Sequence, residues 1–129
     1  MASELRVTTI ANNAGTESVN TTFVVNGSAK AWFNLDGTDT IAFRDSFNCS
    51  SATDNGPGDY TVPFSSSFGN VNHCSTGMLN TNLSTQRSRL PCLTGPLTAS
   101  QITVECCLST DGSFVDPESL QVVIHGDPA

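Results

Sequence analysis

Short runs in which apolar and polar residues alternate are the feature that most constrains how this chain folds. The clearest runs cover residues 102–108 and residues 120–124, where every second side chain is apolar. A period of two places those side chains on one face of a β-strand. No stretch of the chain has the 3.6-residue period of a long amphipathic helix. The pattern therefore predicts an all-β fold built from short strands.

Turn sequences divide the central region into further strands. An Asp-Gly dipeptide, a strong hairpin signal, separates a run over residues 29–35 from a run over residues 40–47. In the second of these runs we expect Ile41, Phe43 and Phe47 to share one face of the strand.

Four other segments are interpreted in the same way. Residues 5–10 and 22–25 are expected to be strands, and residues 53–58, which are rich in Asn, Gly and Pro, a turn. Residues 60–64 alternate again. Because proline cannot donate a hydrogen bond within a sheet, Pro63 predicts that this strand lies at an edge or contains a bulge.

Together these strands predict a single β-sandwich or jelly-roll-like domain over residues 29–129. A chain of 129 residues fits one such domain. Residues 69–96 are rich in Asn, Thr and Ser, and we expect one or two strands and long loops there. Residues 1–28 contain few large apolar groups and are expected to form an extended N-terminal arm that adds a strand or reaches a neighbouring subunit.

Composition excludes several classes of partner. The net charge is −7 with only five Lys and Arg residues, and nucleic-acid binding depends chiefly on such residues neutralising phosphates. Binding to an anionic membrane surface fails for the same reason. The N-terminal residues lack the apolar core of a signal peptide, so we expect the protein to stay in the cytosol where it is made, or to leave it by a route that needs no such peptide.

A long block between residues 31 and 62 carries the most specific sequence signal. Its residues are Ala31-Trp32, Asn34, Gly37-Thr38, Arg44-Asp45-Ser46-Phe47-Asn48, Thr53-Asp54-Asn55-Gly56 and Gly58-Asp59-Tyr60-Thr61-Val62. The block resembles one that is common in tail-fibre-type virion structural proteins of marine and other environmental bacteriophages. Residues 3–10 and 122–127 resemble the opening and closing segments of the same family.

This resemblance implies a bacteriophage virion protein with a compact β domain that assembles as a trimer and has no catalytic residues. The chain would be assembled in the host cytoplasm and carried on the particle exterior. Its partners would be other copies of itself and capsid, neck or tail proteins. A short fibre, a neck or collar component and a capsid decoration (cement) protein all fit the length of the chain.

The alternative function is a receptor-binding module of the tail that recognises host surface glycans. This function predicts a shallow, exposed site lined by aromatic or amide side chains, and residues 70–89 are the segment where we would expect it. Trp32 is a possible sugar-stacking residue, but its apolar neighbours favour a place in the core.

The chain has five cysteines, so pairing within the chain leaves at least one thiol over. With no C-x-x-C motif and two histidines, a zinc site is not expected. Cys106 and Cys107 are adjacent, and their Cα atoms, about 3.8 Å apart, are too close for the usual disulfide geometry. By strand phase Cys106 faces the core and Cys107 faces outward.

Two roles are therefore expected for the cysteines. Cys107, Cys92 and Cys74 are candidates for intersubunit disulfides that form after the particle leaves the reducing cytosol. Cys49 and Cys106 are candidates for buried core thiols, since free cysteine is among the most buried residue types.

No catalytic site, metal site or cofactor is expected. His73-Cys74 could pair a thiol with a base, but catalytic partners are usually brought together by the fold rather than by sequence. The acidic segment 54–59 lacks the ligand spacing of a calcium loop and is better explained as a turn.

Overall fold

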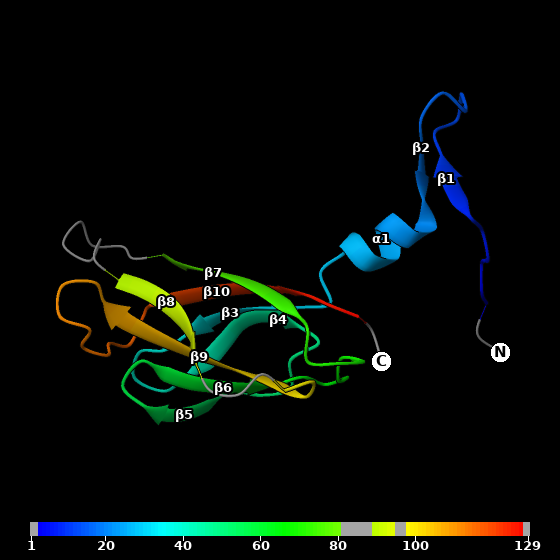
Figure 1. Cartoon of the computed structure of the whole chain (residues 1–129). Helices are drawn as coiled ribbons and strands as arrows, with labels where there is room; N and C mark the ends of the chain where they lie inside the picture. Colours follow the sequence, from blue (N-terminus) through cyan, green and yellow to red (C-terminus); the bar gives the residue numbers. More distant parts are fainter. Residues whose placement is uncertain (1–2, 81–88, 95–97, 128–129) are drawn as a thin grey trace.

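The computed structural model describes residues 3–80, 89–94 and 98–127. Two four-stranded antiparallel sheets pack face to face, which confirms the all-β prediction. A two-stranded hairpin and one short helix precede the sheets and lie beyond one end of them (Figure 1).

The first sheet has the strand order β4-β3-β10-β7. Its strands are β3 (Ala31–Asp36), β4 (Ala42–Phe47), β7 (Cys74–Asn80) and β10 (Ser119–His125). The second sheet has the order β5-β6-β9-β8. Its strands are β5 (Thr53–Gly56), β6 (Asp59–Pro63), β8 (Arg89–Thr94) and β9 (Gln101–Leu108).

The core lies between the two sheets and consists of the side chains that alternate along the central strands. The predicted inward faces of residues 102–106 and 120–124 are confirmed. The core residues are Ala31, Phe33, Leu35, Tyr60, Val62, Phe64, Phe68, Ile102, Val104, Cys106, Leu120, Val122 and Ile124. Burial of this apolar surface at roughly 25 cal/mol per Å² is what holds the sheets together.

A polar network closes the end of the sandwich farthest from the hairpin. Tyr60 is fully buried, and its hydroxyl donates a 2.8 Å hydrogen bond to the Asp116 carboxylate. The same carboxylate oxygen accepts from the backbone N–H of Gly58 at 2.7 Å. The backbone N–H of Gly37 donates to the Pro117 carbonyl at 2.9 Å. These bonds tie the β3–β4 turn, the β5–β6 turn and the β9–β10 connection to one another.

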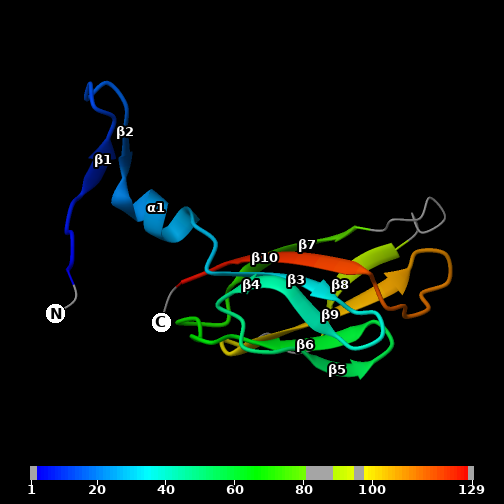
Figure 2. The same ribbon diagram turned by 180° about the vertical axis from the view of Figure 1, so that it is seen from behind.

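The described part of the N-terminal arm, residues 3–28, contains strands β1 (Thr9–Ala11) and β2 (Ser18–Asn20) and helix α1 (Thr21–Gly27). Among the described strands, β1 pairs only with β2. The hairpin projects away from the sandwich, and α1 connects it to β3; the view from behind in Figure 2 shows the same arrangement.

The strand predicted over residues 22–25 is wrong, because these residues form α1. The reason is an N-cap: the Asn20 side chain accepts a 2.8 Å hydrogen bond from the backbone N–H of Thr22 and so starts the helix. The strand predicted over residues 5–10 is shorter than expected and begins only at Thr9.

Strand β4 contains a bulge at Arg44. Leu35 of β3 lies opposite Phe43, and Asn34 lies opposite Asp45, so Arg44 has no residue opposite it. The Arg44 guanidinium instead pairs with the Asp36 carboxylate at 2.6 Å.

The bulge overturns the prediction that Phe43 and Phe47 share one face. Phe43 packs inward, 5.8 Å from the ring of Phe33. Beyond the extra residue the alternation is reversed, so Phe47 faces outward opposite Trp32 and is 53% exposed. The expected core position of Trp32 is also wrong, because its side chain is half-buried on the outer face of the first sheet.

Two predictions about the second sheet are corrected as well. Strand β6 is not an edge strand, because it lies between β5 and β9. The other alternative was a bulge, and the ladder between β5 and β6 does contain one, but its extra residue is Asn55 of β5. Pro63 is tolerated there because it is the last residue of β6, beyond Thr61, where the ladder to β5 ends. The turn expected over residues 53–58 is shorter: Thr53–Gly56 forms β5, and only the Pro57-Gly58 dipeptide turns.

Replacing Tyr60 with Phe should lower the free energy of unfolding by about 1–2 kcal/mol, because the Asp116 carboxylate loses a buried donor. Urea titration followed by circular dichroism measures the change. The matched control is Ser109→Ala, which removes an exposed hydroxyl. Equal stabilities for Y60F and the unaltered chain would show that the network contributes nothing.

Candidate assembly surfaces and thiols

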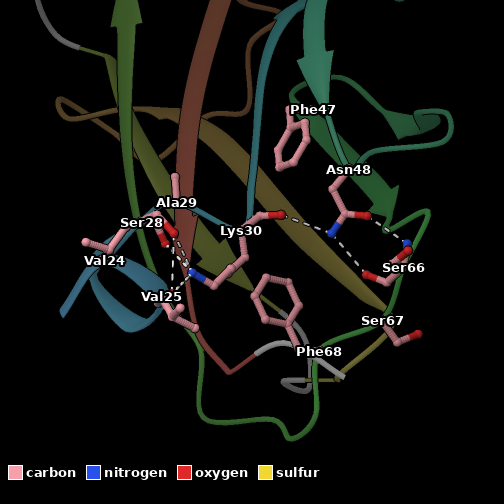
Figure 3. A pocket seen from close by; sticks show the side chains of 10 residues that line it. All are labelled: Val24, Val25, Ser28, Ala29, Lys30, Phe47, Asn48, Ser66, Ser67 and Phe68. Carbon is pink, nitrogen blue, oxygen red and sulfur yellow. Dashed lines mark hydrogen bonds between the residues drawn. The ribbon is translucent and has the colours of Figure 1, made fainter. Parts of the chain in front are cut away.

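An open groove of about 650 Å³ lies where α1 meets the sandwich. Figure 3 shows its lining side chains, which come from three segments of the chain. They are Val24, Val25, Ser28, Ala29, Lys30, Phe47, Asn48, Ser66, Ser67 and Phe68. Because most of its lining is apolar, the groove is suited to an apolar side chain from another molecule.

Lys30 connects the helix to the sandwich. Its ammonium group donates to the Val25 and Ser28 carbonyls and to the Ser28 hydroxyl, as Figure 3 shows. A cation at a helix C-terminus is favourable because it offsets the partial negative charge of the last carbonyls. The Lys30 backbone N–H also donates to Ile124, so the same residue begins the β3–β10 ladder.

Asn48 holds the opposite wall of the groove. Its side-chain amide donates to the carbonyls of Lys30 and Ser66, both at 3.0 Å, and its side-chain oxygen accepts from the Ser66 N–H at 2.7 Å. Asn48 adopts a left-handed backbone with φ of +56°, which Asn tolerates better than most residues. Nothing in the sequence around Asn48 indicated this role.

The arm carries an unusual share of the exposed apolar surface. Every side chain from residue 3 to residue 28 is exposed except the half-buried Thr21. Seven of the thirteen exposed large hydrophobic residues in the described ranges lie in this segment. They are Leu5, Val7, Ile10, Val19, Phe23, Val24 and Val25. Phe23, at 76% exposure, and Leu5, at 84%, are the most exposed of them.

The outer face of the first sheet presents a second apolar surface, which sequence reasoning missed. In register across this face, Trp32 lies between Phe47 of β4 and Val123 of β10. This row continues the arm-side groove onto the face of the sheet, because Phe47 belongs to both. The bulge in β4 is what turns Phe47 toward this face, and no sequence pattern revealed it.

Amide side chains lie beside Trp32 on the same face. The Ser119 hydroxyl donates to the Asn34 side chain at 2.8 Å, and the Gln121 amide donates to Ser119 at 3.4 Å. Trp32, Asn34, Gln121 and Val123 line a shallow hollow of about 350 Å³. The segment where such a site was expected, residues 70–89, is described only for residues 70–80 and 89.

The structure distributes the five cysteines over three environments, and none of them is in a disulfide. Cys106 lies in the core, and Cys49 is half-buried against it. Cys74 is exposed on β7. Cys92 and Cys107 come together on the outer face of the second sheet, where their sulfur atoms are 3.8 Å apart.

The environment of Cys49 suppresses its reactivity. Burial raises the pKa of the Cys49 thiol to about 11, although a hydrogen bond with the Trp32 backbone opposes the shift. The thiolate is the reactive form of cysteine, so this residue is a poor nucleophile near neutral pH.

His73 and Cys74 lie in different environments. The His73 ring is buried beside Phe64 and Phe68, and its Nε2 atom lies 3.1 Å from the Thr98 carbonyl. Cys74 is exposed and is the first residue of β7. In the described ranges, no cluster of three or more His, Cys, Asp or Glu side chains is arranged to hold a metal ion. No helix within those ranges is both long and apolar enough to cross a membrane.

Comparison of the chain with protein-family models, with curated proteins and with solved structures gives no match.

Alkylation should separate the Cys49 thiol from the Cys74 thiol in the folded chain. With a pKa of about 11, roughly one Cys49 in a thousand is a thiolate at pH 8. Iodoacetamide should therefore modify the exposed Cys74 first, and the Cys49 rate should rise about tenfold per pH unit until pH 11. Time-resolved peptide mass spectrometry measures both rates, and equal rates at pH 8 would contradict the burial of Cys49.

Proposed function

We propose that this chain is a structural protein on the exterior of a bacteriophage particle and that it assembles through its N-terminal arm. The observation that carries the proposal is that the arm leaves seven large hydrophobic residues exposed and buries none of them fully. The proposal includes the finer expectations of a jelly-roll-like fold and a homotrimer. Eight strands divided equally between two sheets are compatible with the first of these.

The physical argument concerns what keeps the arm folded. An isolated two-stranded hairpin is at best marginally stable in water. A helix shorter than about 12 residues is also marginal alone, and α1 has seven residues. Ordering these segments costs conformational entropy that burial must offset. No side chain between residues 3 and 28 is fully buried within the chain. We therefore propose that a neighbouring molecule supplies the burial that keeps the arm folded.

The identity of that neighbour follows from the sequence resemblance. Tail-fibre-type virion proteins assemble with copies of themselves and with other particle proteins. Three of the 28 arm residues are charged, namely Glu4, Arg6 and Glu17, and Arg6 pairs with Glu4 at 3.0 Å. The exposed apolar side chains of the arm therefore fit association by interface burial rather than by charge. A short fibre, a neck or collar component and a capsid decoration protein all use this mechanism, and the proposal covers the three positions.

The arm can be tested with the double variant Ile10→Asp and Phe23→Ser. Both side chains are at least half exposed in the chain, so the monomer should fold normally, as far-UV circular dichroism will report. The variant should sediment as a monomer, whereas the unaltered chain should sediment with three times the chain mass. The Kd for self-association should rise by at least tenfold. A tenfold rise corresponds to roughly 1.4 kcal/mol, and the loss of one buried apolar side chain readily costs more.

The matched control replaces exposed apolar residues of the sandwich, Val71→Asp and Phe114→Ser, which are exposed to a similar extent. This control should keep the oligomeric state of the unaltered chain. A chain that remains monomeric at high micromolar concentration and still enters particles normally without its arm would refute the proposed role of the arm.

The second candidate function is glycan recognition by the outer face of the first sheet. The observation that favours it is the hydrogen-bonded series of Asn34, Ser119 and Gln121 beside the half-buried Trp32. Sugar rings stack on aromatic faces, and their hydroxyl groups pair with amide side chains held in place.

Replacing Trp32 with Ala should abolish binding to any glycan that the unaltered chain retains on an array, while leaving the oligomeric state unchanged. The control is Phe114→Ala, which removes an exposed aromatic ring outside this face. If the unaltered chain binds no glycan and no host cell surface, this second function is excluded.

A further inference from the structure

Two thiols lie within reach of one another on the outer face of the second sheet. Cys92 belongs to β8 and Cys107 to β9, and their sulfur atoms are 3.8 Å apart. In the register of the two strands Cys92 lies opposite Glu105, and Leu90 lies opposite Cys107. The two cysteines are therefore diagonal neighbours on one face. Cys92 is exposed and Cys107 is half-buried, so solvent and small oxidants reach the pair.

We infer that Cys92 and Cys107 form an intrachain disulfide when the chain is oxidised. The sulfur atoms must approach to about 2.05 Å, which is a movement of under 2 Å from their present separation. Diagonal residues in an antiparallel pair have Cα atoms about 7–8 Å apart, slightly more than the usual disulfide range of 4.4–6.8 Å. A small shift of one strand closes this difference.

The position of β8 permits that shift. It is an edge strand, bonded to β9 on one side only among the described strands. Proline at position 91 also removes one backbone donor from it. The central strand β9 is held on both sides, by β6 and by β8, so β8 is the strand that moves.

Cys106 and Cys74 do not compete for the same bond. Cys106 points into the core, on the opposite face of β9 from Cys107. Cys74 lies on the first sheet. The sequence suggested that Cys92 and Cys107 bond to other subunits. A disulfide between the two uses both thiols within one chain and leaves neither for such a bond. The inference does not depend on the proposed function.

The chemistry balances with a small disulfide such as oxidised glutathione as the oxidant. One cysteine thiolate attacks a glutathione sulfur, forms a mixed disulfide and expels one glutathione thiolate. The second cysteine thiolate attacks the protein sulfur of that mixed disulfide and expels the other glutathione. The chain loses two protons and two electrons, and the oxidant becomes two molecules of glutathione.

The closeness of the two thiols disfavours ionisation of Cys107. The hydrogen bond with Cys92 is the largest cause that raises the pKa of the Cys107 thiol, and partial desolvation adds to it. Because each step needs a thiolate, disulfide formation should become faster as the pH rises from 7 to 9.

Peptide mapping of the full-length chain tests the inference. The reduced protein is treated with oxidised glutathione at pH 8, remaining thiols are blocked, and trypsin and a Glu-specific protease are added without reductant. Cleavage after Arg89, Glu105 and Glu118 separates one peptide that contains only Cys92 from another that contains Cys106 and Cys107. We expect these two peptides to remain linked and Cys92 and Cys107 to carry no glutathione.

Three variants make the result specific. The linkage should persist in Cys106→Ala and in Cys74→Ser, and it should be lost in Cys107→Ser, which should retain one glutathione on Cys92. In concentrated urea the linkage should fall several-fold, because all five cysteines then compete. Linkage that survives Cys107→Ser, glutathione retained on both cysteines of the unaltered chain, or covalent dimers joined through Cys92 or Cys107 would each overturn the inference.

Discussion

The buried Tyr60 hydroxyl needs a hydrogen-bond acceptor, and this requirement determines how one end of the sandwich is built. Burial and the hydrogen bond to Asp116 both raise the pKa of Tyr60, so the hydroxyl stays protonated and donates. Glycine is required in both turns that join this network. A Cβ at Gly37 would lie 2.8 Å from the Tyr60 ring, whereas Gly58 has a φ of +65° and lies against the backbone of Val115. The Tyr60 ring therefore specifies the β3–β4 turn, and the β9–β10 connection specifies the β5–β6 turn.

The sequence predicted those parts of the fold in which burial alone sets the pattern. Strands β9 and β10 follow a strict period of two because each contributes one face to the core. The helix over residues 21–27 was missed because its valines and threonines favour strands, and only the capping bond from Asn20 indicates otherwise. Short segments that lack tertiary contacts follow local hydrogen bonds more than residue preference.

The candidate sites were harder to predict because they depend on register. The alternation of apolar and polar residues along β9 predicted that Cys107 faces outward. That Cys107 lies close to Cys92 depends on how β8 pairs with β9, which the sequence does not reveal. Trp32 has apolar neighbours in sequence, yet it faces outward because Phe33 takes the core position of that strand. Adjacent aromatic residues in a strand necessarily point to opposite faces, and the sequence alone does not say which one enters the core.

The bulge at Arg44 has a consequence for how a strand of this kind changes over evolutionary time. Arg44 is the one residue of β4 without an opposite, and everything after it has the reverse phase. Deleting the codon of Arg44 would remove the extra residue and leave residues 45–47 on the faces that they occupy now. Ser46 would still lie opposite Phe33, and Phe47 would still lie opposite Trp32. The bulge is therefore a position where the gene can lose a codon and the strand can shorten while the exposed aromatic side chain keeps its direction.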